Sequence, residues 1–164
     1  MFKRSASLTV VSMLFAFTAI HGANAQTLGA HDRPIHDAAR LGSGADVQAI
    51  LKADPAMRDA RTPNGATPLH LAATNPDVTS LKVLIAAGAD ANAKDHDGLT
   101  PLHMAAYTQR APQAQLLLEA GADPYAKSNA GRDTTSMARK AMANEVAGII
   151  SLWILKGCKV GKPC

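Results

Sequence analysis

Aromatic residues are scarce in this 164-residue chain, where Phe, Trp and Tyr together make up 4%. Charged residues reach only 18%, and the formal net charge is +4. An apolar content of 47% excludes an intrinsically disordered chain, which needs low hydrophobicity and high charge. The small basic excess argues against a nucleic-acid binder, and two cysteines are too few for a disulfide-rich scaffold. These absences leave one globular domain with a core of small side chains.

Residues 1–25 are predicted to form a secretory signal peptide. A basic start, an uncharged apolar stretch over residues 8–20 and a small-x-small end at Ala23 and Ala25 follow in the order that a leader requires. A retained membrane anchor is the alternative, but this stretch is short for a helix that must cross about 30 Å of hydrocarbon. The leader fits a Gram-negative exporter, so a periplasmic location is expected, with secretion as the alternative.

A repeat of 33 residues organises the rest of the chain. Residues 65–73 (GATPLHLAA) recur as residues 98–106 (GLTPLHMAA), and residues 87–90 (AGAD) recur as residues 120–123. Residues 34–39 (PIHDAA) match the first motif 34 residues earlier. Because the period and the motifs recur together, the chain is predicted to consist of stacked structural repeats.

This pattern resembles the ankyrin-repeat family, whose unit is a β-turn and two antiparallel helices around T-P-L-H-x-A. The resemblance implies an all-α repeat solenoid, with about four helix-turn-helix units joined by hairpin loops. It covers residues 32–155, in units 32–57, 58–90, 91–123 and 124–155, between an N-terminal extension (26–31) and a C-terminal tail (156–164).

The repeated residues of each unit are predicted to set its helix ends. Thr67 and Thr100 are expected to cap the first helix of their units. Gly88 and Gly121 are expected to end the second helix with a positive φ. The last unit lacks the T-P-L-H motif, but Asp133 is expected to cap its first helix.

Three histidines, His36, His70 and His103, share one repeat position. The resemblance implies that they make local hydrogen bonds, and one repeat step keeps them too far apart to bind one ion. His96 lies between two aspartates, residues 95–97, at a predicted hairpin tip. A metal site there is an alternative, although three adjacent turn residues seldom converge on an ion. No cofactor and no metal are expected.

No catalytic motif of the G-x-S-x-G, Walker A or H-E-x-x-H type occurs in the sequence, so a non-enzymatic protein is predicted. Cys158 and Cys164 have lysines but no histidine nearby, which argues against a cysteine nucleophile. Thiols of exported chains usually oxidise, and Gly161 and Pro163 allow the chain to turn back. A Cys158–Cys164 disulfide is therefore predicted, with a redox switch or a two-cysteine metal contact as alternatives.

Partner recognition, as the resemblance implies, uses the hairpin tips and the exposed ends of the first helices. Tyr107 is the preferred anchor, because an exposed tyrosine offers a large area at low rotamer entropy; the alternative is that it only covers the edge of the stack. A cationic ladder of Arg61, Lys94 and Lys127 is expected to favour an acidic patch on the partner. The full predicted set is Arg61, Asn64, Thr74, Asn75, Lys94, His96, Asp97, Leu99, Tyr107, Thr108, Lys127, Asn129, Arg132 and Lys140.

The predicted function is that of an exported, monomeric module that binds a partner protein, without nucleic acid or a membrane anchor. Leader-bearing bacterial ankyrin proteins have a similar layout, which implies scaffolding or inhibition in stress protection or toxin neutralisation. A secreted effector that binds a host protein is the first alternative. A small metal-dependent protein that uses residues 95–97 or the cysteine pair is the second.

Overall fold

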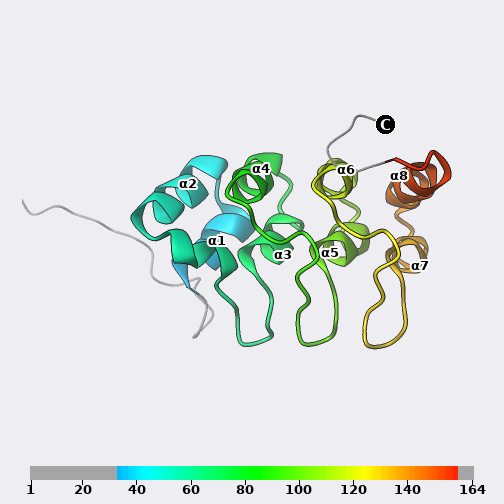
Figure 1. Ribbon diagram of the computed structural model, residues 1–164, viewed down its shortest axis with the longest axis horizontal. Coiled ribbons are helices and arrows are strands. Elements are labelled where there is room, and N and C mark those ends of the chain that lie inside the picture. Colours follow the sequence, from blue (N-terminus) through cyan, green and yellow to red (C-terminus); the bar gives the residue numbers. More distant parts are fainter. Residues whose placement is uncertain (1–32, 159–164) are drawn as a thin grey trace, which may run out of the picture.

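The computed structural model describes residues 33–158, and within them the regular structure is helical (Figure 1). A short 3-10 helix, η1 (Pro55–Asp59), and a single bridge between Lys127 and Asp133 are the only other regular features of that range. The α-helices form successive antiparallel pairs: α1 (Pro34–Leu41) with α2 (Gly44–Ala53), α3 (Pro68–Ala72) with α4 (Val78–Ala86), α5 (Pro101–Tyr107) with α6 (Ala111–Glu119), and α7 (Thr134–Lys140) with α8 (Asn144–Leu155). The predicted all-α repeat solenoid is confirmed.

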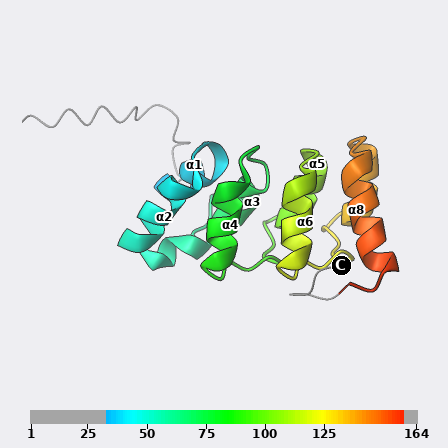
Figure 2. The same cartoon turned by 90° about the horizontal axis from the view of Figure 1, so that it is seen from above.

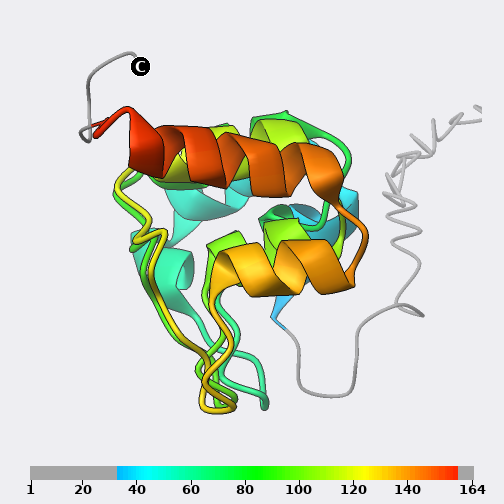
Figure 3. The ribbon, with the colours of Figure 1, turned by 90° about the vertical axis from the view of Figure 1, so that its right-hand side faces the viewer.

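The helix pairs stack into two layers. The first helices, α1, α3, α5 and α7, each contact the next first helix, and the second helices, α2, α4, α6 and α8, do the same. Figure 2 shows the second helices side by side along the stack. In Figure 3, which looks along the stack, the hairpins overlie one another and project from the first helices, away from the second ones. The hairpins and the first helices therefore share one face of the solenoid.

The helices begin where the repeated motifs predict. Thr67 and Thr100 are the N-cap residues of α3 and α5, each followed by a proline in the first turn. Proline suits this position because its missing N–H has no helical partner to lose. The carboxylate of Asp133 accepts a hydrogen bond from the amide of Ser136 at 2.7 Å, so the predicted cap of α7 is confirmed.

The second helices α4 and α6 end at glycines with a left-handed backbone. Gly88 has a φ of +83° and Gly121 a φ of +99°. In both places, the amide of the following alanine returns to a carbonyl oxygen five residues earlier, at 3.0 Å for Ala89 and 2.9 Å for Ala122. These bonds satisfy carbonyl groups that the helix end leaves without a partner. The chain then turns back towards the next hairpin.

The core consists mainly of alanine and leucine. Ala39, Ala72, Ala105 and Ala138 follow one another at steps of 33 residues, and all four are completely buried. Such small side chains allow the first helices to approach closely, while leucine and isoleucine fill the space between the layers. Trp153 is the aromatic residue of this core among the residues that the structure describes. The rest of the core packs without aromatic side chains because small aliphatic residues fill it.

Several predictions concern residues 1–32 and 159–164, which lie outside the described residues. They include the leader, the N-terminal extension and Cys164, so the Cys158–Cys164 disulfide stays a prediction. None of the helices between residues 33 and 158 has the length and apolar character needed to cross a membrane. η1 lies across the predicted boundary between residues 57 and 58.

Candidate functional site

Three hairpins of identical construction project from the stack. Their closing bonds run from the amide of Thr62 to the carbonyl of Ala66 at 2.9 Å, from Asp95 to Leu99 at 3.0 Å, and from Ser128 to Arg132 at 3.0 Å. The donors are 33 residues apart, as are the acceptors. The repeated sequence thus places equivalent side chains at regular intervals along one face (Figure 1).

The hairpin tips are bonded to one another through their backbones. The amide of His96 donates to the carbonyl of Asn64 at 3.0 Å, and the amide of Asn129 donates to the carbonyl of Asp97 at 2.9 Å. The side-chain amide of Asn129 adds a bond to the carbonyl of His96 at 2.9 Å. These four residues, exposed at the tips, form a continuous hairpin edge. Their backbones are fixed by these bonds, while their side chains remain exposed.

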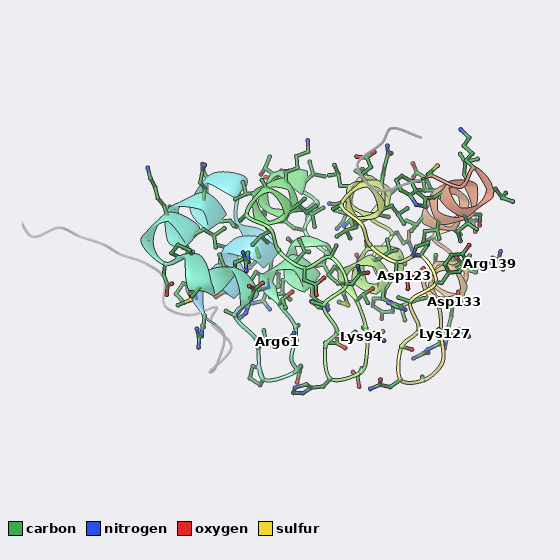
Figure 4. All side chains as sticks on the ribbon, in the orientation of Figure 1. Arg61, Lys94, Asp123, Lys127, Asp133 and Arg139 are labelled. Atoms are coloured by element: carbon green, nitrogen blue, oxygen red, sulfur yellow. The ribbon has the colours of Figure 1, made fainter. Side chains whose placement is uncertain are left out.

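The cationic ladder of Arg61, Lys94 and Lys127 runs along the same hairpins (Figure 4). Arg61 Nη1 donates to the carbonyl of Lys94 at 2.8 Å, and Lys94 Nζ donates to the carbonyl of Lys127 at 3.3 Å. The predicted alignment is therefore present. Two of its three cations also donate hydrogen bonds that tie neighbouring hairpins together.

The repeated histidines join each unit to the next. The amide of Thr67 donates to His70 Nδ1 at 3.1 Å, and His70 Nε2 donates to the carbonyl of Leu99 at 3.0 Å. His103 repeats this arrangement towards Arg132, and His36 Nε2 bonds the carbonyl of Ala60. Because a carbonyl oxygen only accepts, Nε2 carries a proton. Because Nδ1 of His70 and of His103 accepts a bond from a backbone amide, these two imidazoles are neutral. The predicted structural role of the three histidines is confirmed.

Burial lowers the pKa of His70 and of His103 below the usual value of about 6.5. Protonation of Nδ1 would also place two N–H groups against each other, because a backbone amide already donates to this nitrogen. In His103 the donor is the amide of Thr100, at 3.1 Å. The folded chain therefore favours neutral histidines at both positions.

A groove of about 370 Å³ opens between α5 and α7, on the face that bears the hairpins. Its floor is apolar, Tyr107 stands at its side with 65% of its surface exposed, and two cations lie at its rim. We call this the α5–α7 groove, and its lining residues are Leu99, Met104, Tyr107, Arg132, Met137, Lys140 and Ala141. Four of these, Leu99, Tyr107, Arg132 and Lys140, belong to the predicted partner-binding set.

The prediction for Asn75 is wrong. Its side chain is only 3% exposed, and its Nδ2 donates to the carbonyls of Ala39 at 3.1 Å and Gly42 at 2.9 Å. The residue closes the end of α1 and therefore offers no side chain to a partner. Thr74 and Thr108 are half-buried, and their hydroxyls donate back to their own helices at 2.7 Å.

The carboxylate of Asp95 stabilises the turn of the hairpin that contains residues 95–97. Asp95 Oδ1 accepts from the amides of Asp97 at 3.0 Å and Leu99 at 2.8 Å, as a turn requires. Among residues 33–158, no three His, Cys, Asp or Glu side chains gather in a way that could hold a metal ion.

Sequence reasoning missed the floor of the groove, which Met104, Met137 and Ala141 form. Met104 and Met137 occupy the same repeat position, 33 residues apart, and this spacing was the available signal. A larger hollow of about 680 Å³ lies between α2 and α4, and four alanines are among its lining residues. Its lining contains no aromatic side chain and one charged residue, Lys52. The α5–α7 groove, which has an aromatic ring and two cations, is therefore the better candidate site.

Comparison with known families agrees with this architecture. Residues 9–128, nearly three quarters of the chain, match the family profile of ankyrin repeats in three copies. The match ends before α7, and the fourth helix pair continues the stacking of the first three. Ankyrin repeats are generally non-enzymatic modules of protein–protein interaction. The chain belongs to the ankyrin-repeat family.

Proposed function

We propose that this protein is an exported, non-enzymatic module that binds a partner protein through the hairpin edge and the α5–α7 groove. The observation that carries the proposal is Tyr107, a largely exposed ring beside an apolar floor and two cations. Exposed aromatic side chains next to small hollows are frequent centres of binding energy at protein interfaces.

The rigidity of the face supports this role. Backbone bonds join the hairpin tips, and the ladder residues Arg61 and Lys94 join their stems. A surface that is already ordered loses little conformational entropy when a partner binds. Among the residues that the structure describes, no three His, Cys, Asp or Glu side chains on this surface gather in a way that could hold a metal ion.

We also propose that the mature protein is a monomer. We place it in the periplasm, because residues 1–25 have the three-part pattern of a leader. There it would scaffold or inhibit its partner, in stress protection or in toxin neutralisation, whereas a secreted effector would act on a host protein. Cell fractionation and N-terminal sequencing test the location. The proposal expects a periplasmic chain that begins at Gln26, and a cytoplasmic chain that begins at Met1 would contradict it.

Oxidation of the tail offers a second test of export. The proposal expects no free thiol in the purified protein without reductant, because Cys158 and Cys164 would be bridged in an oxidising compartment. Two titratable thiols would contradict both the disulfide and the compartment.

Capture of the partner tests the binding role. The purified protein is immobilised and exposed to periplasmic extract, beside Tyr107→Ala and a matched control, Tyr125→Ala. Tyr125 is 63% exposed but lies outside the groove, so both variants remove a ring of similar exposure. A stoichiometric protein that Tyr107→Ala loses and Tyr125→Ala retains supports the proposed face.

A further inference from the structure

Positive charge is concentrated in the last unit of the stack. Residues 124–158 contain five Lys or Arg and two Asp or Glu, whereas residues 91–123 contain two and four. The α5–α7 groove lies at this transition, because α5 belongs to the acidic unit and α7 to the basic one. Its cations, Arg132 and Lys140, both come from the basic unit.

These two cations have no carboxylate partner within residues 33–158. Both side chains are exposed, and the ion pairs of that range join Arg40 to Asp37 and Arg58 to Asp59. This distinguishes them from the ladder residues Arg61 and Lys94, whose cations are bonded to backbone carbonyls. Arg132 and Lys140 are therefore available to pair with an acidic partner, as is Lys127 at the end of the ladder.

The floor between these cations suits an apolar side chain. Met104 is half-buried, Met137 is buried, and Tyr107 provides an aromatic side wall. Methionine side chains are flexible and polarisable, so they adapt to different apolar shapes. A hollow of about 370 Å³ lies at the lower end of the range of ligand sites, about 300–1,000 Å³, and its size also fits one or two side chains of a docked segment.

The charge distribution argues against nucleic acid as the occupant. A phosphate backbone needs a continuous basic track, but the neighbouring unit carries Asp95, Asp97, Glu119 and Asp123. A short acidic segment meets the two cations without extending along that acidic unit.

We propose that the α5–α7 groove recognises an acidic segment of the partner protein in which an apolar side chain is flanked by Asp or Glu. The apolar side chain lies on Met104 and Met137 beside Tyr107. The flanking carboxylates pair with Arg132 and Lys140. This inference rests on the proposed function and specifies the chemistry of the partner.

Selection from a library of random 12-residue peptides displayed on phage tests the inference against the full chain. The expected pool is enriched in Leu, Ile, Met or Phe next to Asp or Glu. Affinities of the selected peptides are then measured by fluorescence polarisation for two charge-reversal variants, Lys140→Glu and Arg139→Glu. These adjacent residues of α7 are both exposed, but only Lys140 lines the groove, whereas Arg139 lines a hollow on another side.

Lys140→Glu is expected to weaken binding at least about tenfold and Arg139→Glu less than about twofold, because only the first reverses the charge at the contact. An equal loss in both variants overturns the inference, since net charge alone would explain it. A pool without acidic enrichment, or no enriched pool at all, also overturns it.

Two further outcomes separate this inference from the proposed function. Peptides that Tyr107→Ala no longer binds, but that carry no acidic preference, leave the proposed face intact and overturn the acidic specificity. A concentration-dependent dimer in sedimentation that Lys140→Glu abolishes assigns the groove to a second copy of the chain, and it overturns the inference. Circular dichroism of each variant confirms that the fold is retained.

Discussion

Arg61 and Lys94 are 33 residues apart, and the guanidinium of the first donates to the carbonyl oxygen of the second at 2.8 Å. Lys94 repeats the relationship towards Lys127 at 3.3 Å. Residues at one repeat position therefore act as ties between successive hairpins. The sequence period therefore sets which residues join one hairpin to the next, although the donor is a guanidinium at Arg61 and an ammonium at Lys94.

This relationship predicts unequal effects of removing the ladder cations. Arg61→Ala removes bonds to the carbonyls of Lys94 and Gly65, so it should lower the free energy of unfolding by about 1 kcal/mol. Lys127→Ala is the control, because no further hairpin follows it within residues 33–158, and its effect should stay within about 0.5 kcal/mol. Urea unfolding measures both. Equal losses would show that the bonds of Arg61 contribute nothing.

Substitution of Gly98 and of Gly131 by alanine can separate two effects, the close approach of neighbouring hairpin tips and the strain of a left-handed backbone. Gly98 and Gly131 both have a φ of +71°, so alanine at either position should cost about 1–2 kcal/mol. A Cβ on Gly98 would also lie 2.8 Å from the backbone nitrogen of Asn129, whereas a Cβ on Gly131 meets nothing within 4 Å.

Gly98→Ala is therefore expected to destabilise the protein by a further ~1–3 kcal/mol relative to Gly131→Ala, because the hairpins must move apart. Urea unfolding midpoints compare the two variants. Identical midpoints would contradict the bonded hairpin edge.

The buried histidines predict a loss of stability in mild acid. The pKa of His70 and of His103 is lowered in the folded chain, while the unfolded chain has a value of about 6.5. As the pH falls through about 6.5, the unfolded state binds protons that the folded state does not, so the free energy of unfolding falls. The slope is at most about 1.4 kcal/mol per pH unit for each histidine, and it ends at the folded-state pKa.

Urea unfolding between pH 7.5 and pH 5.5 measures this slope. The range stays above the region where Asp46, Asp77 and Asp133, whose pKa values are also lowered, lose their contributions. His103→Gln should reduce the slope by one residue's share. Stability that is constant or increases towards pH 5.5 would be incompatible with neutral buried histidines.

Asn75 is predicted to act on stability and not on recognition. Asn75→Ala removes the side-chain donor to the carbonyl of Ala39 and one of the two side-chain donors to the carbonyl of Gly42, which also accepts from Ser80 Oγ, so it should lower the free energy of unfolding by about 1–3 kcal/mol. Asn64→Ala, at the exposed hairpin edge, is the control and should change it by less than about 0.5 kcal/mol. Thermal unfolding compares them, and an Asn75→Ala variant as stable as the parent chain would contradict this role.

The fold could be predicted from the sequence because the residues that form the turns and cap the helices recur with the period of the repeat. Thr67, Gly88 and His70 have roles that follow from local chemistry, and the structure confirms them. The position of Tyr107 was also accessible, since it ends the first helix of its unit. Such features depend on a few neighbouring residues and the repeat step.

The errors concern residues whose environment depends on packing between units. Asn75 follows α3, and its side chain bonds carbonyl groups at the end of α1, in the preceding unit. Met104 and Met137 have the spacing of core residues, and only the stacking of α5 on α7 leaves a groove above them. A period alone does not reveal which apolar positions stay accessible.

Tyr107 is the proposed anchor of the partner, and the binding role of this face depends on it most directly. The decisive measurement is the affinity of the captured partner, by isothermal titration calorimetry, for the parent chain, Tyr107→Ala and Tyr125→Ala. Because truncation of an interface anchor costs about 2 kcal/mol or more, Tyr107→Ala should weaken binding by about 30-fold or more, while Tyr125→Ala should change it less than about twofold. Equal affinities for all three proteins would contradict the assignment of this face.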